Sequence, residues 1–293
     1  MPLRRSSQCI RCNQFPEEQL IPEGVTTRNL MILLLTACLL MSCDDVFQVH
    51  PYDMRFGGET NINAHHIAEI TSRCQDKDTL RIAFISDTHC WYLDAKDEVA
   101  NINQQAGIDF VIHLGDLTDT GTTKEFTWAR DMLNGLQMPY IALIGNHDFL
   151  GTGDQCYEAM FGPKNFSFIV ARIKFVCLNT NATEYDYMAP VPDFDYMEKE
   201  MTADSTRFDR TILLMHAPPY SDQFNNNVVK AFQRYTSFFP CLMFCVYGHN
   251  HEQKVGSFYD DGIIYYGVDC AEHRNYYIFT LTHDGYDYEI VRY

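Results

Sequence analysis

Five short clusters of histidine, carboxylate and asparagine residues are the part of this 293-residue chain that could do chemistry. They are Asp87–His89, Asp116–Asp119, Asn146–Asp148, His216 and His249–His251. Carboxylate oxygens and imidazole nitrogens suit zinc, manganese or iron, and the absence of cysteine from the set argues against a structural thiolate zinc site. Seven or eight such ligands are too many for one ion with an open position. The pattern therefore predicts two metal ions that share a bridging carboxylate.

The elements that must position these clusters are five predicted β-strands. Each cluster directly follows an apolar, strand-like run, and these runs are 81–86, 109–114, 139–144, 211–215 and 242–247. Such runs are typical of strands that are covered on both faces. Helices are predicted near 95–105, 123–136, 195–203 and 228–238. Because ligands of open α/β sheets bind at the carboxyl ends of the strands, we expect the clusters to meet at one edge.

The remaining segments decide the domain organisation. Strands are predicted at 168–179, 262–268, 275–282 and 286–292, with antiparallel pairing at least in part. There is no internal repeat, so 80–293 is predicted to be one α/β domain. Residues 43–79 are polar with little periodicity and are predicted to be a lead-in or tether, while 1–42 are predicted to be an upstream segment and signal peptide.

The ordered motifs D-x-H, G-D-x-x-D, G-N-H-D, a lone histidine and G-H-x-H resemble those of the calcineurin-like metallophosphoesterase superfamily over about residues 80–270. Any one of these motifs is weak, whereas five in order are specific. The resemblance implies a four-layer α/β/β/α sandwich with a dinuclear metal centre at the C-terminal strand ends. It also implies a metal-dependent hydrolase of phosphate mono- or diesters.

The resemblance implies a role for each matching residue. Seven positions match metal ligands: Asp87, His89 and His251 for the first ion, Asn146, His216 and His249 for the second, and Asp116 as the bridge. The ions would be divalent or trivalent Mn, Fe or Zn. A metal-bound hydroxide would attack phosphorus in line, and His147, oriented by Asp119, would protonate the leaving alkoxide, a step worth roughly 100- to 10,000-fold. Asp148 is predicted to cap the following turn.

Other residues leave alternatives open. His113 lies inside an apolar run and is predicted to be a core histidine with one hydrogen bond. His273 is open between a substrate contact, which some members of the resembled superfamily have in this region, and no function. Trp91 and Tyr92 could form an aromatic wall for a base or aryl leaving group, or could be packing. Thr120 stands where protein Ser/Thr phosphatases have an arginine, so protein dephosphorylation is disfavoured.

The substrate class is only narrowed. The core is compact and has no obvious cap domain, which resembles the small phosphodiesterases and phosphatases of the superfamily. A phosphodiesterase is slightly preferred. A metallo-β-lactamase-like hydrolase would need an H-x-H-x-D-H cluster, which is absent. The alternative from another class is a non-catalytic surface lipoprotein that uses the same fold as a metal- or ligand-binding module.

The charge excludes one class of partner. The chain has 22 Lys and Arg against 39 Asp and Glu, a formal net charge of −17. This surplus repels a phosphate backbone, so binding of duplex nucleic acid through a basic face is not expected. A small phosphorylated substrate would instead meet positive charge at the metal ions. No protein partner can be inferred.

The N-terminal region has the features of an export signal. Leu30 to Met41 is an apolar run, too short for the roughly 20 residues of a membrane span and typical of a signal-peptide core. Leu40-Met41-Ser42-Cys43 resembles a lipobox, which predicts a lipid anchor at Cys43 and a place in the bacterial cell envelope, at the periplasmic or surface face. Because Met41 is an imperfect lipobox residue, secretion to the periplasm is the alternative, and a buried helix is a further one. Residues 1–29 are long for the segment before such a core, so translation is expected to start further along.

The cysteines do not predict a disulfide framework. Seven follow Cys43, an odd number. Four are interpreted as lying in apolar, strand-like runs and are predicted to be buried free thiols: Cys177, Cys241, Cys245 and Cys270.

Overall fold

The computed structural model describes residues 27–41 and 54–293, which belong to two separate units. In the first, the predicted apolar run forms helix α1 (Thr27–Met41), and its side chains from Leu30 to Leu35 are exposed. Among the described residues, no helix combines the length and the hydropathy needed to cross a membrane. The predicted lipid-attachment residue, Cys43, lies outside the described residues.

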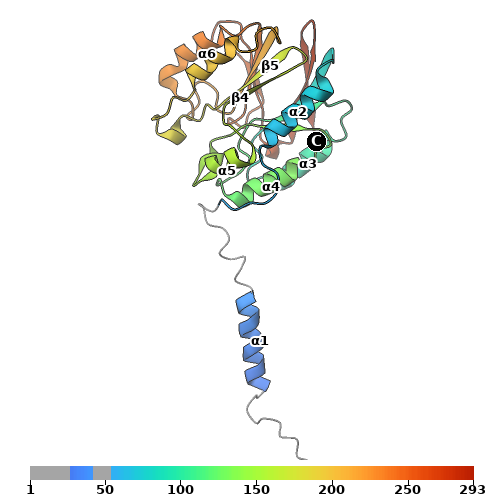
Figure 1. The fold of residues 1–293 in the computed structure, drawn as a ribbon, viewed down its shortest axis with the longest axis vertical. Helices are drawn as coiled ribbons and strands as arrows, with labels where there is room; N and C mark the ends of the chain where they lie inside the picture. Colours follow the sequence, from blue (N-terminus) through green and yellow to red (C-terminus); the bar gives the residue numbers. More distant parts are fainter. Residues whose placement is uncertain (1–26, 42–53) are drawn as a thin grey trace, which may run out of the picture. The chain divides into compact units, whose positions relative to one another are not determined.

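The second unit contains two β-sheets (Figure 1). The first sheet has five strands in the order β11 (Tyr286–Arg292), β10 (Asn275–Thr282), β1 (Thr79–Ile85), β2 (Phe110–His113) and β3 (Tyr140–Ala142). Strands β1, β2 and β3 are parallel, and β10 is antiparallel to both of its neighbours. The parallel strands therefore end at the same edge of the sheet.

The second sheet has six strands, in the order β4 (Phe166–Val170), β5 (Ile173–Leu178), β6 (Arg210–Met215), β7 (Leu242–Tyr247), β9 (Tyr265–Gly267) and β8 (Lys254–Gly256). Strands β5, β6, β7 and β9 are parallel, and the outer strands are antiparallel to them. The single strand predicted at 168–179 is wrong, because β4 and β5 form a hairpin there. Its turn residues, Ala171 and Arg172, have φ values of 47° and 61° without being glycine, so the composition carried no turn signal.

Helices complete a four-layer α/β/β/α sandwich, which confirms the predicted fold class. Apolar side chains of both sheets, including Phe84, Phe175 and Phe244, form the central core. The outer layers are α3 (Tyr92–Ile102), α4 (Thr123–Leu133) and α5 (Gly153–Met160) on the first sheet, and α6 (Phe194–Thr202) and α7 (Val229–Thr236) on the second. One-turn 3-10 helices occur at η1 (His147–Phe149), η2 (Thr183–Tyr185), η3 (Asn226–Val228) and η4 (Ala271–His273).

The compact unit begins before Leu80, which corrects the predicted boundary. Helix α2 (Ile62–Cys74) lies within the predicted tether, yet its Ile62, Ile70 and Cys74 are buried in the core clusters. The Asn63 side chain donates to the Ala142 carbonyl at 2.8 Å and accepts from the Ala142 amide at 2.9 Å. These two hydrogen bonds satisfy backbone groups of β3, which lies at the edge of its sheet. Only a few apolar positions of α2 are buried, so its periodicity was too weak to predict packing.

The local sequence explains where individual helices begin. Thr122 caps α4, because its hydroxyl oxygen accepts the Glu125 amide and the Glu125 carboxylate in turn accepts the Thr122 amide. Asp193 caps α6 in a similar way through the Tyr196 amide.

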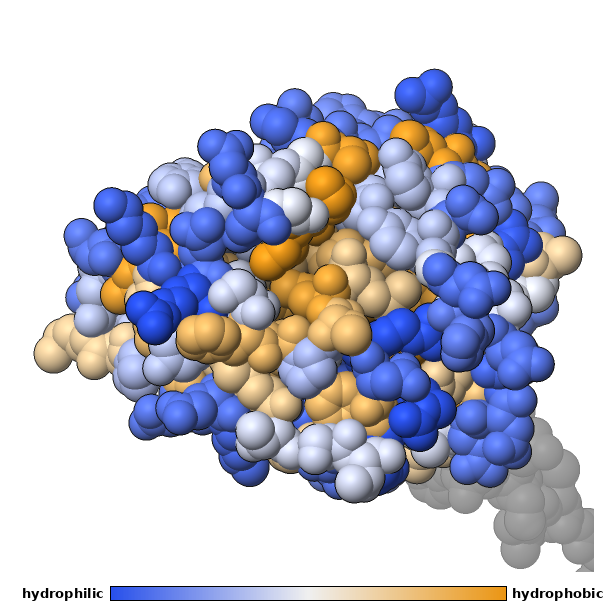
Figure 2. Space-filling model, turned by 90° about the horizontal axis from the view of Figure 1, so that it is seen from above, coloured by the Kyte–Doolittle hydropathy of each residue, from blue (hydrophilic) through white to orange (hydrophobic). Residues whose placement is uncertain are grey.

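Among residues 54–293, all seven cysteines are free. Cys177, Cys245 and Cys270 are buried, as predicted, but Cys241 is exposed. It immediately precedes β7 with a φ of 41° and so belongs to the turn, not to the strand. Figure 2 shows one face of this unit, on which hydrophilic residues surround a central hollow where hydrophobic residues gather.

Candidate metal centre

The five predicted clusters all follow strand ends of the two sheets, and the structure brings them together. Asp87 follows β1, Asp116 follows β2, Asn146 follows β3, His216 follows β6, and His249 and His251 follow β7. Four of the seven predicted ligands have a left-handed backbone, with φ of 51° at Asp87, 57° at Asp116, 70° at His249 and 47° at His251. Such strained conformations in non-glycine residues concentrate at functional sites.

Glycines permit the loops to approach one another. A Cβ at Gly145 would lie 2.1 Å from Asp116 Oδ1, and a Cβ at Gly248 would lie 2.0 Å from the Ser86 hydroxyl oxygen. No side chain fits at either position. These two glycines of the predicted motifs are therefore required by close contacts between loops that are far apart in the sequence.

The first group of side chains contains Asp87, His89 and His251. Asp87 is fully buried, and its Oδ1 lies 3.1 Å from His251 Nε2 while its Oδ2 accepts the His249 amide at 3.0 Å. His89 is 4% exposed, and its Nε2 is buried without a hydrogen-bond partner in the described part of the chain. A buried imidazole nitrogen without a hydrogen-bond partner is costly, and a bound cation would satisfy its lone pair.

The second group contains Asp116, Asn146, His216 and His249. Asn146 Oδ1 lies 3.1 Å from His216 Nε2 and 2.9 Å from His249 Nδ1. The other nitrogen of His216, Nδ1, lies 2.9 Å from the Leu114 carbonyl and so carries a proton, which makes Nε2 the nitrogen that faces the group. An amide oxygen, a carboxylate and two imidazoles form a donor set that suits a divalent metal.

Asp116 connects the two groups. Its Oδ2 lies 3.8 Å from His89 Nε2 and 3.3 Å from His216 Nε2, and its Oδ1 accepts the His147 amide at 2.9 Å. Only 1% of Asp116 is exposed. One carboxylate thus lies between the imidazoles of both groups, which is the position a bridging ligand requires.

Opposite charges in the two groups act on one another. Burial alone would raise the pKa of Asp87, but the hydrogen bond with His251 and nearby positive charge hold it well below its usual range. Burial alone would lower the pKa of His216, but the Asp116 carboxylate raises it to about 9. A cation that binds here would therefore compete with a proton on His216.

His147 lies beside the first group and is partly exposed. Its ring stacks on that of His89, with centroids 4.3 Å apart. The Asp119 backbone carbonyl lies 2.9 Å from His147 Nδ1, whereas the carboxylate Oδ1 lies 3.7 Å away. The same carboxylate oxygen accepts the Cys90 thiol at 2.9 Å and lies 3.5 Å from His89 Nδ1. Asp119 therefore contacts His147 chiefly through its main chain.

Asp148 does not cap the following turn, which corrects the prediction. Its buried carboxylate accepts the Leu117 amide at 3.3 Å, the Thr118 amide at 2.9 Å and the Gly145 amide at 2.9 Å. It thereby joins the loop after β2 to the loop after β3. Burial and the Asp116 charge raise the pKa of Asp148 to about 7.

His113 is fully buried, as expected, but makes two contacts instead of one. Its Nε2 lies 3.0 Å from the Thr88 hydroxyl, and its Nδ1 accepts the Gly115 amide at 3.2 Å. Burial lowers the pKa of His113 to about 3, so the ring is neutral. A neutral ring can bridge the two loops that carry Asp87 and Asp116.

Sequence reasoning missed Asp222. This exposed residue lies in the loop between β6 and α7, and its Oδ1 lies 2.7 Å from His249 Nε2. The loop contains no motif, so only the tertiary structure shows that Asp222 orients this histidine. Carboxylates in such positions fix the tautomer of a ligating histidine.

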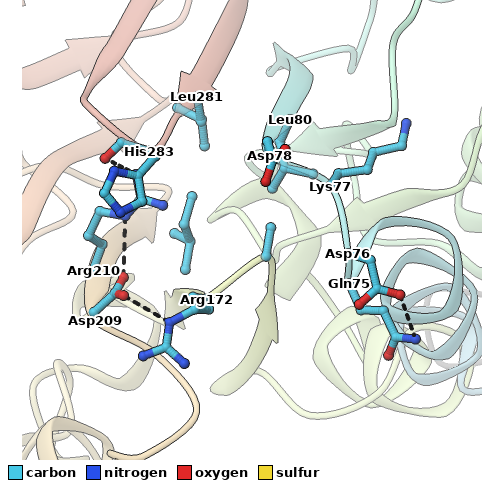
Figure 3. Close-up of a pocket in the computed structure, with 12 residues that line it drawn as sticks. Gln75, Asp76, Lys77, Asp78, Leu80, Arg172, Asp209, Arg210, Leu281 and His283 are labelled. Carbon is cyan, nitrogen blue, oxygen red and sulfur yellow. Dashed lines mark hydrogen bonds and ion pairs between the residues drawn. The ribbon is translucent and has the colours of Figure 1, made fainter.

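A cavity of about 230 Å³ lies at the opposite ends of the strands (Figure 3). Its lining comes from the start of β1, β5 and β6 and the end of β10. Its charged lining residues are three basic ones, Lys77, Arg172 and Arg210, and three acidic ones, Asp76, Asp78 and Asp209. This cavity contains none of the predicted site residues and is not part of the candidate metal centre.

Comparison with known proteins agrees with this geometry. A family model described as calcineurin-like phosphoesterase matches residues 80–253. A 3',5'-cyclic-nucleotide phosphodiesterase of Nostoc sp. is 25% identical over 158 residues, which are 50% of this chain and 57% of that protein. A probable cyclic nucleotide phosphodiesterase of Xenorhabdus bovienii is 21% identical over 111 residues, which are 38% of this chain and 43% of that protein. The chain thus spans about half the length of the curated relatives it matches.

A solved structure shares the fold. GAP50 of Plasmodium, described as the anchor in the inner membrane complex, superposes with a TM-score of 0.54 and 12% sequence identity. The superposition covers 74% of this chain and 85% of that chain. At this identity the likeness concerns the fold alone.

Proposed function

Because the chain belongs to the calcineurin-like phosphoesterase family, we propose that it is a hydrolase of phosphate mono- or diesters that uses two metal ions. The observation that carries the proposal is the position of Asp116 between two groups of ligand-type side chains. The first ion would be held by Asp87, His89 and His251, and the second by Asn146, His216 and His249. Two bound cations would offset the charge of the phosphoryl oxygens and make a water molecule more acidic.

His147 would act as the general acid. Its Nδ1 is engaged by the Asp119 carbonyl, so Nε2 is the nitrogen available to a leaving oxygen. The Asp119 carboxylate lies 3.7 Å from the same ring nitrogen, and the His147 amide donates to Asp116 Oδ1, which holds the backbone of His147 in place. Asp119 is thus a positioning residue, and His147 donates the proton.

A preference for diesters has separate support. Both curated relatives named above are described as cyclic nucleotide phosphodiesterases. Trp91 lies edge-on to His89 and to His251, with ring centroids 5.3 and 5.4 Å away. An aromatic side chain next to the first group favours a substrate with a base or an aryl group. We therefore propose a small phosphodiester with an aromatic substituent as the preferred substrate.

Metal analysis combined with two chromogenic esters tests the proposal. The wild-type protein should bind metal and hydrolyse bis-p-nitrophenyl phosphate faster than p-nitrophenyl phosphate. Asp116→Asn should lose both metal and turnover, whereas the matched control Asp195→Asn, at an exposed position of α6, should keep both. A wild-type protein that binds no metal and hydrolyses neither ester would contradict the proposed hydrolase. The alternative of a non-catalytic binding module would then remain. Turnover of the monoester alone would contradict the diester preference.

We also propose that Cys43 carries a lipid that anchors the protein in the bacterial cell envelope. The support is the apolar run at 30–41 and the lipobox-like residues that follow it. Expression with a labelled fatty acid should label the wild-type protein and leave Cys43→Ser unlabelled and released from the membrane fraction. Equal labelling of both would contradict the anchor.

A further inference from the structure

A second set of metal-type ligands lies in the short loop after β9. Asp269, Cys270 and His273 offer a carboxylate, a thiol and an imidazole whose ligand atoms lie within 4.8 Å of one another. None of the three belongs to the candidate metal centre described above. We propose that they form a further metal site that binds zinc or a cation of similar preference.

The spacing of the ligand atoms suits one tetrahedral ion. Cys270 Sγ lies 3.8 Å from His273 Nδ1, and Asp269 Oδ1 lies 2.7 Å from the same nitrogen. Bonds of about 2.3 Å to sulfur and about 2.0 Å to nitrogen place these ligands about 3.5 Å apart in tetrahedral zinc. Small rotations of the side chains would therefore accommodate the ion. Three protein ligands leave its fourth position for water.

The chemistry of the set differs from that of the centre at the strand ends. Here a thiolate and a carboxylate would neutralise the charge of a divalent ion, and the soft sulfur selects zinc over magnesium or calcium. His273 is half exposed, with 51% of its side chain accessible, whereas Asp269 and Cys270 are buried. An ion can thus reach the site from the solvent side and be held from the protein side.

Hydrogen bonds from Asn275 hold the side chain of Asp269 and the backbone of His273 in this loop. Asp269 Oδ2 accepts the Asn275 side-chain amide at 3.0 Å, and that amide also donates to the His273 carbonyl at 3.1 Å. Asn275 is 6% exposed, and its own Oδ1 has no hydrogen-bond partner in the part of the chain described. Such buried contacts orient ligands before a metal arrives.

Cobalt provides a readout that separates this site from the other. Neither ligand group of the centre at the strand ends contains a cysteine, although Cys90 lies beside it with His89 and Asp119. A thiolate-to-cobalt charge-transfer band in the near ultraviolet that does not depend on Cys90 would therefore report the loop site. The cobalt-loaded wild-type protein should show this band. Cys270→Ser should abolish it and lose about one ion per chain by metal analysis, and His273→Ala, at a half-exposed position, should weaken both signals.

Two controls make the result decisive. Cys90→Ser should keep the band, because Cys90 is the thiol that lies near His89 and Asp119. Asp116→Asn should also keep it, even if that variant loses the metals of the strand-end centre. No band in the wild type, or a band that disappears in Cys90→Ser and persists in Cys270→Ser, would overturn the loop site without bearing on the proposed hydrolase.

Discussion

The Asp222 carboxylate accepts a hydrogen bond from the imidazole of His249, with 2.7 Å between Oδ1 and Nε2. The other ring nitrogen, Nδ1, lies 2.9 Å from Asn146 Oδ1 in the second ligand group. Because Nε2 must carry the proton that it donates to Asp222, Nδ1 keeps its lone pair. An exposed loop residue, Asp222, therefore leaves the lone pair of His249 on the nitrogen that faces the candidate metal centre.

Removing this carboxylate should weaken metal binding at the second group. We expect Asp222→Ala to lower the affinity of that group by about 10- to 100-fold, as is usual when a partner of a metal-bound histidine is lost. Competition with a chelator would measure the change. Asp195→Ala is the matched control, and an affinity equal to that of the wild type would show that Asp222 does not orient His249.

Replacing His147 should separate proton donation from metal binding. His147→Ala should keep its metal, because none of the seven proposed ligands is changed, but should slow esters with poor leaving groups by about 100- to 10,000-fold. Substrates whose leaving groups need no proton should be affected much less. Rates for a series of aryl esters of increasing leaving-group pKa would test this. Equal losses across the series would contradict the general-acid role.

Asp148 should matter for stability more than for the chemistry itself. Asp148→Asn replaces an acceptor of several amide hydrogen bonds by a side chain with a donor, so buried amides lose their partner. We expect the free energy of unfolding to fall by about 2–4 kcal/mol in urea denaturation. Asp195→Asn should be neutral. A similar stability of Asp148→Asn and wild type would mean that the two loops do not depend on this carboxylate.

Glu98 should make stability depend on pH. It lies on α3 with 2% exposure, its Oε2 has no hydrogen-bond partner within residues 54–293, and burial raises its pKa well above the ordinary value. The folded protein therefore retains this proton at pH values at which the unfolded chain has lost it. The contribution of Glu98 to the free energy of unfolding thus falls as the pH rises from the pKa of Glu98 in the unfolded chain towards its pKa in the folded protein.

Glu98→Gln should remove that dependence. We expect it to raise the melting temperature at about pH 8 and to change it much less at about pH 4, where the carboxyl is mostly protonated in both states. Glu198→Gln, at an exposed position of α6, is the control. A melting temperature that rises equally at both pH values would show that the charge of Glu98 is not the cause.

Much of the fold could be predicted because its core strands are local patterns. The runs that became β1, β2, β3, β6 and β7 are apolar and bounded by polar clusters, and they form strands within a few residues of the expected limits. The hairpin turn at Ala171 and Arg172 and the packing of α2 could not be predicted in this way. Both depend on neighbours distant in the chain, which compensate an unusual backbone in one case and bury a few side chains in the other.

For the site, the sequence alone determined which residue types follow each strand, and hence the candidate ligands from Asp87 to His251. Their order along the chain is enough to predict that they meet, because parallel strands present their carboxyl ends at the same edge of a sheet. Only the tertiary structure decided what surrounds them: that Asp222 orients His249, that Asp148 joins two loops, and that Asp119 reaches His147 through its carbonyl. These contacts connect loops from different strands, and hydrogen bonds of that kind depend on distances of a few tenths of an ångström, which no spacing along the chain encodes.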